Sequence, residues 1–296
     1  MKRVNIGLLG IGNVGSGVYS ILNINGNKIN ESAEKEITIK KILVNDVNKK
    51  REFSFDRDML TSDVESILED PDIDIVIEVL GGIHPAYEYM KRALLNKKHV
   101  VTANKAVIAT YGQDLIQTAE ENNVSLRYEA SVGGGIPIIN TLSNPLSVNN
   151  FEEIMGIVNG TTNYILTQMT DFGLEYEAVL KVAQEKGFAE ADPTSDVEGE
   201  DAAYKLAILL STAFGINVSP DQIPREGITK ISKDDIEYAS QFGYKIKLLS
   251  TAKKHNDELE FHVHPTLIPS THPLASVSNE FNALFVKGNA VGELML

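Results

Sequence analysis

Short apolar runs alternate with helical patterns along the first 130 residues of the chain. The first apolar run, residues 4–9, ends at a glycine, and residues 14–22 follow with apolar positions at helical spacing. Later apolar runs predict strands at 37–44, 73–80, 100–102 and 124–127, and helical spacing predicts helices at 86–96 and 114–122. Strands that alternate with helices predict a mostly parallel sheet that is covered on both faces.

The pattern changes after residue 130. Three glycines at 133–135 and then Pro137 interrupt the chain, and the regular alternation stops. Further strands are predicted at 151–158, 245–252, 259–264 and 283–286, and helices at 161–170, 176–184 and 201–213. We therefore expect an α/β domain over residues 1–130 and an α+β domain over residues 131–296. The open sheet of the second domain is a common surface for pairing subunits.

Composition and charge narrow the class of protein. With 296 residues, 43% hydrophobic and 23% charged, the chain has ordinary globular usage and a length that suits about two domains. The net charge of −14 repels phosphate backbones and anionic lipids, so we expect no nucleic-acid or membrane partner. The sequence has no cysteine, which excludes cysteine nucleophiles and fits a cytoplasmic protein.

Residues 10–15 read Gly-x-Gly-x-x-Gly directly after the first predicted strand and at the start of a helix. Gly10 would make the tight turn, Gly12 would allow close approach of a pyrophosphate, and Gly15 would allow close helix packing. The helix N-terminus would attract the anion. This context predicts a Rossmann-type dinucleotide-binding domain, with a tight turn that binds nothing as the alternative.

The second strand offers two interpretations of the cofactor. Asp46 follows it and could hold the ribose of NAD, although it lies 31 positions after Gly15 instead of the usual 20 or so. Lys49, Lys50 and Arg51 follow directly and could meet the 2′-phosphate of NADP, or form a solvated loop. Both cofactors remain open, with NADP slightly favoured.

Residues 185–201 contain seven acids and one base, followed by Lys205. Such a cluster is either a solvated loop or a site for a substrate ammonium group. Asp201 and Lys205 share a helix face at i and i+4, where a surface ion pair would contribute only about 0.2–0.5 kcal/mol. Asp196 has the alternative role of a helix cap.

Other polar residues fall at the ends of predicted elements. Lys105 follows a strand at the carboxyl edge of the first sheet, where it would either point at a cofactor or be solvated. Residues 159–163, Asn-Gly-Thr-Thr-Asn, are typical of a strand-to-helix turn and suggest a structural role. The six histidines lack the spacing of a zinc helix, so we expect no catalytic metal.

Taken together, these motifs resemble bacterial homoserine dehydrogenases over essentially the whole chain. The resemblance rests on residues 7–17, 101–105, 129–137, 156–163, 187–205 and 272–275. It implies interconversion of L-homoserine and L-aspartate 4-semialdehyde with NADP or NAD, on a route to methionine, threonine and isoleucine. It also implies a homodimer or a dimer of dimers.

The resemblance further implies roles for individual residues. Lys205 would transfer the proton at the substrate oxygen, and Lys105 would assist beside the nicotinamide. The residues implied at the cofactor are Gly10, Gly12, Asn13, Val14, Gly15, Lys105, Gly187 and Gly292, and those at the substrate are Gly160, Thr161, Glu190, Asp196 and Asp201. A structural sodium ion would be held by Glu129, Val132, Gly134 and Ile136, largely through backbone oxygens, which are hard donors.

The sequence departs from the family pattern in two ways. Glu200 and Tyr204 stand where an apolar residue and an arginine are more usual. The chain also stops at Leu296, so we expect residues 287–296 only to begin the return to the nucleotide domain. This leaves a catalytically silent dinucleotide-binding fragment as the alternative function. An aspartate semialdehyde dehydrogenase would need a cysteine nucleophile, and the chain has none.

Overall fold

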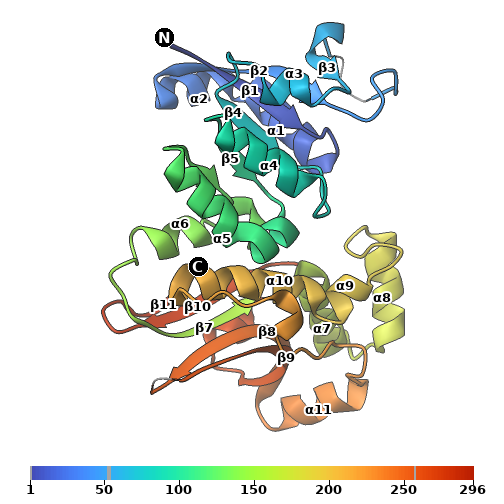
Figure 1. Cartoon of the computed structure of the whole chain (residues 1–296). Coiled ribbons are helices and arrows are strands. Elements are labelled where there is room, and N and C mark those ends of the chain that lie inside the picture. Colours follow the sequence, from blue (N-terminus) through green and yellow to red (C-terminus); the bar gives the residue numbers. More distant parts are fainter. Residues whose placement is uncertain (1, 52–54, 257) are drawn as a thin grey trace. The chain divides into compact units, whose positions relative to one another are not determined.

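The computed structural model describes residues 2–51, 55–256 and 258–296 of the chain. The chain divides into two compact units, Met1–Ser131 and Val132–Leu296. Each unit contains one β-sheet with helices packed against it (Figure 1).

The first unit is built on a six-stranded parallel sheet in the order β3-β2-β1-β4-β5-β6. The strands are β1 (Lys2–Leu9), β2 (Lys35–Leu43), β3 (Leu60–Thr61), β4 (Ile75–Glu78), β5 (His99–Thr102) and β6 (Leu126–Arg127). The helices are α1 (Asn13–Ile24), α2 (Gly26–Ala33), α3 (Glu65–Leu68), α4 (Ala86–Leu95) and α5 (Lys105–Glu121). Strands β2 and β3 are added on one side of β1, and β4, β5 and β6 on the other side. Ligands of such folds bind at this switch point, between β1 and β4.

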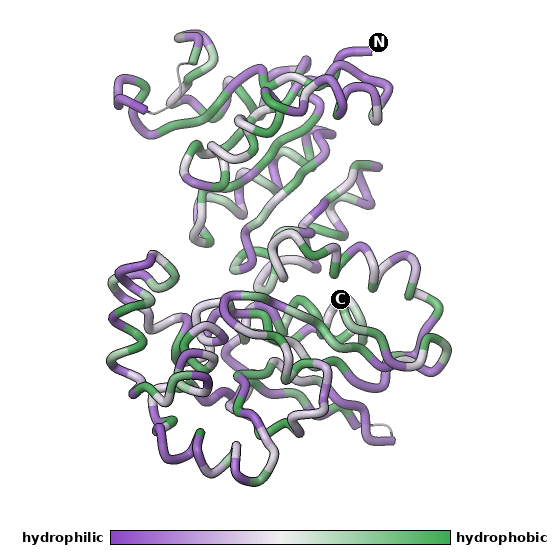
Figure 2. Tube along the Cα trace, turned by 180° about the vertical axis from the view of Figure 1, so that it is seen from behind, coloured by the Kyte–Doolittle hydropathy of each residue, from purple (hydrophilic) through white to green (hydrophobic). Residues whose placement is uncertain are grey.

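Apolar side chains fix α1 against the centre of this sheet. Leu8 on β1 and Ile42 on β2 are fully buried, and Val18 of α1 packs against them. Burial of one such side chain contributes about 1.5–3 kcal/mol. The central strands are correspondingly hydrophobic in Figure 2, whereas the peripheral loops are mostly hydrophilic. The predicted α/β class of this unit is therefore confirmed.

The second unit is built on a five-stranded antiparallel sheet in the order β11-β10-β7-β8-β9. The strands are β7 (Phe151–Ile157), β8 (Tyr244–His255), β9 (Glu258–Pro269), β10 (Ala283–Gly288) and β11 (Gly292–Met295). The helices are α6 (Ile138–Ser143), α7 (Gly160–Phe172), α8 (Tyr176–Glu185), α9 (Thr194–Val197), α10 (Glu200–Leu209) and α11 (Lys233–Gln241). This arrangement confirms the predicted α+β class of the second domain.

The two faces of the second sheet are covered differently. Side chains alternate between the faces along β8, so Leu249 and Ser250 point in opposite directions. Leu249 packs in an apolar cluster with Leu274 and Phe285. The Ser250 hydroxyl donates to the carbonyl of Ala202 at 3.2 Å, which places α10 on the other face.

A buried lysine joins β8 to α7. Lys247 is 3% exposed, and its Nζ donates to Asn163 Oδ1 at 2.9 Å and to the Val277 carbonyl at 2.7 Å. Burial lowers the pKa of Lys247 to about 8, because the low-dielectric interior disfavours the ammonium form. Asn163, which belongs to the turn predicted to be structural, is thereby anchored to the sheet.

The structure contains helices that hydrophobic periodicity did not predict. No described residue of α2 is buried, so that helix has no apolar stripe to detect. Helix α11 begins with a capping box formed by Ser232 and Asp235, which was a readable signal in the sequence. Helix α5 begins at Lys105 rather than at residue 114, because Asn104 caps it.

Within the described residues, no helix is both long enough and apolar enough to cross a membrane.

Candidate active site

The glycine turn between β1 and α1 has the geometry that its pattern predicts. Gly10 has a φ of +103°, and a Cβ there would lie 2.9 Å from the Val79 carbonyl oxygen. A Cβ at Gly15 would lie 2.2 Å from the Gly10 carbonyl oxygen. Both positions are closed to larger residues, so α1 can pack closely against the turn.

Gly12 differs from both of these glycines. A Cβ built at Gly12 would have nothing within 4 Å, so the residue faces open space. It precedes Asn13 and Val14, the first residues of α1. In the described part of α1, the first turn carries no acidic residue and no side chain caps it. The backbone N–H groups of this turn are thus arranged to receive an anion.

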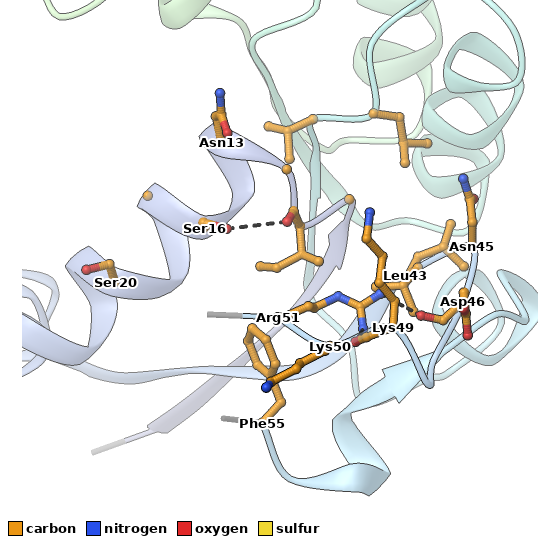
Figure 3. A pocket seen from close by; sticks show the side chains of 17 residues that line it. Asn13, Ser16, Ser20, Leu43, Asn45, Asp46, Lys49, Lys50, Arg51 and Phe55 are labelled. Atoms are coloured by element: carbon orange, nitrogen blue, oxygen red, sulfur yellow. Dashed lines mark hydrogen bonds between the residues drawn. The ribbon is translucent and has the colours of Figure 1, made fainter. Parts of the chain in front are cut away.

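A cavity of about 860 Å³ opens beside this turn (Figure 3). That volume is within the range of small-molecule and cofactor sites. It is lined by Gly10, Ile11, Gly12, Asn13, Ser16, Gly17, Ser20, Leu43, Val44, Asn45, Asp46, Lys49, Lys50, Arg51, Phe55, Val79 and Leu80. All of these residues belong to the first unit, and they include the first two glycines of the motif.

The loop after β2 brings three basic residues to this cavity. Figure 3 shows Lys49, Lys50 and Arg51 together on one side of it. Arg51 is held in place because Nη2 donates to the Asp46 carbonyl at 2.6 Å and Nη1 donates to the Lys49 carbonyl at 2.8 Å. The Asp46 carboxylate accepts the backbone N–H of Asn48 at 2.8 Å. The acid therefore closes its own turn with one oxygen, and it lines the cavity together with the three basic residues.

A buried carboxylate links the ends of β4 and β5. Glu78 is fully buried and accepts the Leu80 N–H at 2.8 Å and the Thr102 hydroxyl at 2.7 Å. Asn104 Nδ2 donates to the Gly82 carbonyl at 2.7 Å, and its Oδ1 accepts the Val107 N–H at 3.2 Å. These contacts fix the backbone that leads into Lys105.

Lys105 is the first residue of α5, at the carboxyl edge of the sheet, and it is partly buried. Sequence reasoning missed Glu78, since a single acid at the end of a strand gives no signal of the partners that it will meet.

In the second unit, Lys205 and Asp201 form a buried ion pair on α10. Lys205 Nζ donates to Asp201 Oδ2 at 2.6 Å and to the Val158 carbonyl at 2.6 Å. Their side chains are 15% and 5% exposed, respectively. The pair is therefore not the exposed surface contact that the spacing alone would suggest, and both groups are held at fixed positions.

Asp196 and Thr161 join the same network. Asp196 is the third residue of α9, so it is not the cap of that helix. Its Oδ2 accepts the Thr161 hydroxyl at 3.1 Å, and its Oδ1 accepts Asn159 Nδ2 at 2.7 Å. Asn159 also donates to Asp201 Oδ2 at 2.8 Å. One connected set of hydrogen bonds thus joins Thr161, Asp196, Asn159, Asp201 and Lys205.

The other two expected substrate residues, Gly160 and Glu190, do not enter the hydrogen bonds of this network. At Gly160 a Cβ would lie 2.8 Å from the Glu280 carbonyl oxygen, so close backbone packing requires glycine there. Glu190 is exposed, and its backbone carbonyl accepts Gln184 Nε2 at 3.1 Å.

Two glycines expected at the cofactor also belong to the second unit. Gly187 follows α8 with a φ of +77°. Gly292 begins β11 with a φ of +71° and pairs with Gly288.

The residues expected to hold sodium lie along a sharp bend. Gly133 and Gly134 have φ values of +72° and +58°, which turn the chain tightly between Val132 and Ile136. Glu129 lies in the short 3₁₀ turn Glu129–Ser131. Among the described residues, no group of three or more histidine, aspartate or glutamate side chains could hold a metal ion.

Comparison with known proteins gives one consistent family for both units. Residues 137–296 match the family described as homoserine dehydrogenase, and residues 10–129 match its NAD binding domain. The chain is 49% identical over 295 residues to homoserine dehydrogenase from Bacillus subtilis (strain 168), covering 100% of this chain and 68% of that protein.

Solved structures agree with this match. A homoserine dehydrogenase from Thiobacillus denitrificans has a TM-score of 0.94 and 43% identity, over 99% of this chain and 68% of that chain. A hyperthermophilic archaeal homoserine dehydrogenase in complex with NADPH has a TM-score of 0.81 and 26% identity, over 99% of this chain and 91% of that chain.

Proposed function

Because the chain belongs to the homoserine dehydrogenase family, we propose that its first unit holds NADP(H) and that its second unit holds L-homoserine or L-aspartate 4-semialdehyde. The family reaction interconverts these two compounds. The observation that supports the assignment most strongly is the Lys205 Nζ, which is fixed between the Asp201 carboxylate and the Val158 carbonyl. A fixed lysine is a group that can accept and return a proton at one defined atom.

The cofactor site is the cavity beside the glycine turn. The open space at Gly12 is the cradle that a Cβ would fill, and the uncapped first turn of α1 suits a pyrophosphate. When bound, the dinucleotide supplies the hydride acceptor for the oxidation. Asn13 and Val14 would contribute backbone N–H groups, and Lys105 would assist near the nicotinamide.

In the oxidation, the C4–H bond of homoserine breaks and its electron pair leaves with the hydride. The hydroxyl proton passes to Nζ of Lys205 in its neutral form, which leaves the carbonyl of the semialdehyde. In the reduction, the same lysine returns a proton to the developing alkoxide. Asp201 and Glu190 would bind the ammonium group of the substrate, with Gly160, Thr161 and Asp196 around it.

We propose NADP as the preferred cofactor. Lys49, Lys50 and Arg51 line the cavity together with Asp46, of which one carboxylate oxygen accepts the Asn48 N–H of its own loop. Three positive charges beside one carboxylate favour a 2′-phosphate over an uncharged ribose hydroxyl.

Replacing Lys49, Lys50 and Arg51 together by glutamine is expected to raise the Michaelis constant for NADP⁺ about tenfold or more. The Michaelis constant for NAD⁺ should change little, because NAD⁺ has no 2′-phosphate for these side chains to contact. A loss of tenfold corresponds to about 1.4 kcal/mol, the scale of one hydrogen bond to a charged group. Steady-state kinetics with both cofactors measure the effect.

A control variant carries the same change of charge outside the cavity, with Lys2, Lys28 and Lys35 replaced by glutamine. It should leave the ratio of the two Michaelis constants unchanged. If the cavity variant also keeps the wild-type ratio, the basic loop does not choose the cofactor.

Three further proposals rest on family membership. A sodium ion would be held by Glu129, Val132, Gly134 and Ile136, largely through backbone oxygens, which are the hard donors that it prefers. The two consecutive glycines with positive φ support this, because they make the tight bend on which these residues lie. The reaction would serve the synthesis of methionine, threonine and isoleucine, and the chain would act as a homodimer or a dimer of dimers.

A further inference from the structure

Asn159 occupies the junction between β7 and α7, next to the residues proposed to perform the chemistry. It is 6% exposed, and every hydrogen-bonding position of its side-chain amide is used. Nδ2 donates to Asp196 Oδ1 at 2.7 Å and to Asp201 Oδ2 at 2.8 Å. Oδ1 accepts the Thr162 N–H at 2.9 Å and the Thr162 hydroxyl at 3.0 Å.

These partners fix the orientation of the amide. The two carboxylates can only accept from Nδ2, and the Thr162 N–H can only donate to Oδ1. A flipped amide would set its oxygen against two carboxylates and its N–H groups against another donor. The side chain therefore has one stable arrangement in this setting.

The contacts of Asn159 lead directly to Lys205. Asp201 Oδ2 accepts both Asn159 Nδ2 and Lys205 Nζ. Lys205 Nζ also donates to the carbonyl of Val158, the residue before Asn159. The β7–α7 junction thus holds the lysine twice, once through its backbone and once through the Asn159–Asp201 contact.

The same amide lies between two carboxylates that repel each other. Asp196 and Asp201 are both within hydrogen-bond distance of one nitrogen, and Asp201 is 3% exposed. Like charges in a poorly solvated site are costly unless donors stabilise them. Among the hydrogen bonds of the described residues, Asn159 is the group that donates to both carboxylates at once.

We propose that Asn159 is a positioning residue of the active site, which holds Asp201, and through it Lys205, in the orientation used for proton transfer. This rests on the proposed role of Lys205. Asn159 would not touch the reacting atoms; it acts through Asp201. Its second task is to cap α7 with Oδ1, and substitution can separate the two tasks.

Asn159→Ser is the informative variant. Serine is a good N-cap, so the Thr162 N–H keeps an acceptor, but the two N–H donors of Nδ2 are lost and the single hydroxyl proton can serve at most one carboxylate. We expect kcat/KM for L-homoserine to fall about tenfold to a hundredfold, the loss typical of a displaced catalytic group. The Michaelis constant for NADP⁺ should change less than about twofold, because Asn159 does not line the cofactor cavity.

Asn159→Ala and Thr162→Val complete the comparison. Asn159→Ala loses both tasks, so it should match the serine variant in kcat/KM but melt at a lower temperature. Thr162→Val removes one hydroxyl contact with Oδ1 and leaves both carboxylate contacts in place, so its kcat/KM should stay close to that of the wild type.

The outcomes distinguish the inference from the proposed function. If the wild-type chain does not oxidise homoserine, or if Lys205 can be replaced without loss, the proposed function fails and the inference fails with it. If the wild type is active and depends on Lys205, but the Asn159→Ser variant keeps a near-wild-type kcat/KM, then Asn159 is only a helix cap and the positioning role is overturned.

Discussion

Replacement of Lys205 by arginine is expected to lower kcat for homoserine oxidation by about a hundredfold to ten-thousandfold, the range for removal of a general acid or base. Arginine keeps a positive charge beside Asp201, so the buried pair is not broken. The guanidinium cannot lose a proton in a protein, so it cannot take one from the substrate hydroxyl. Steady-state kinetics, together with a thermal melt, measure the two effects separately.

Lys205→Met and Lys181→Met are the comparison variants for Lys205→Arg. Lys205→Met removes both charge and base, and it should also destabilise the second unit, because Asp201 stays buried without its cation. Lys181 is an exposed residue of α8, so its replacement should alter neither rate nor stability. NADPH affinity should be unchanged in all three variants. Near-wild-type turnover in Lys205→Arg would remove the assignment of Lys205 as the proton-transfer group.

Gly12→Val is expected to weaken NADPH binding by about a hundredfold or more while the chain stays folded. A Cβ at this position meets nothing within 4 Å, so the side chain enters the space that the pyrophosphate would use. Loss of two hydrogen bonds to a charged group, at about 1.5–3 kcal/mol each, accounts for this magnitude. The chain has no tryptophan, so the fluorescence of NADPH itself can report binding.

Gly26→Val is the matched control for Gly12→Val. A Cβ at Gly26 also meets nothing within 4 Å, but this residue begins α2 and does not line the cavity. The NADPH affinity of Gly26→Val should equal that of the wild type. The melting temperatures of Gly12→Val and Gly26→Val should be comparable with each other. An unchanged affinity in Gly12→Val would mean that the dinucleotide does not approach the chain at this turn.

The sequence predicted those parts of the fold that depend on local pattern. The glycine motif gave the roles of Gly10 and Gly15, because a positive φ and a close approach each require the absence of a side chain. The central strands were predicted because they are continuous apolar runs. Helix α2 was not, because its residues are polar and none that the structure describes is buried.

The network around Lys205 could be predicted only in part. The spacing of Asp201 and Lys205 suggested a pair, but burial decides whether that pair is weak or strongly held, and burial depends on the whole fold. Asn159 lies 37 and 42 positions before the two aspartates that it bridges. No local pattern reports a contact over that separation, so residues 159–163 were interpreted as a structural turn.

The two units also differ in how readily their chemistry was recognised. A dinucleotide site is built largely from backbone, so glycine spacing between a predicted strand and a predicted helix predicts it. A substrate site depends on side chains that arrive from different elements. Those of α7, α9 and α10 meet only after the second unit has folded around its sheet.

Oxidation of L-homoserine with a nicotinamide dinucleotide is the reaction expected of this chain. The most direct test is the appearance of NADPH absorbance when the purified chain is mixed with L-homoserine and NADP⁺. L-threonine and glycerol serve as decoy alcohols, and NAD⁺ serves as the second cofactor. We expect the cofactor to be reduced with homoserine and not with either decoy alcohol. NADP⁺ should be reduced faster than NAD⁺. Measurable NADPH binding, with no reduction of NADP⁺ or NAD⁺ by homoserine, would contradict the proposed reaction. It would indicate a catalytically silent dinucleotide-binding protein.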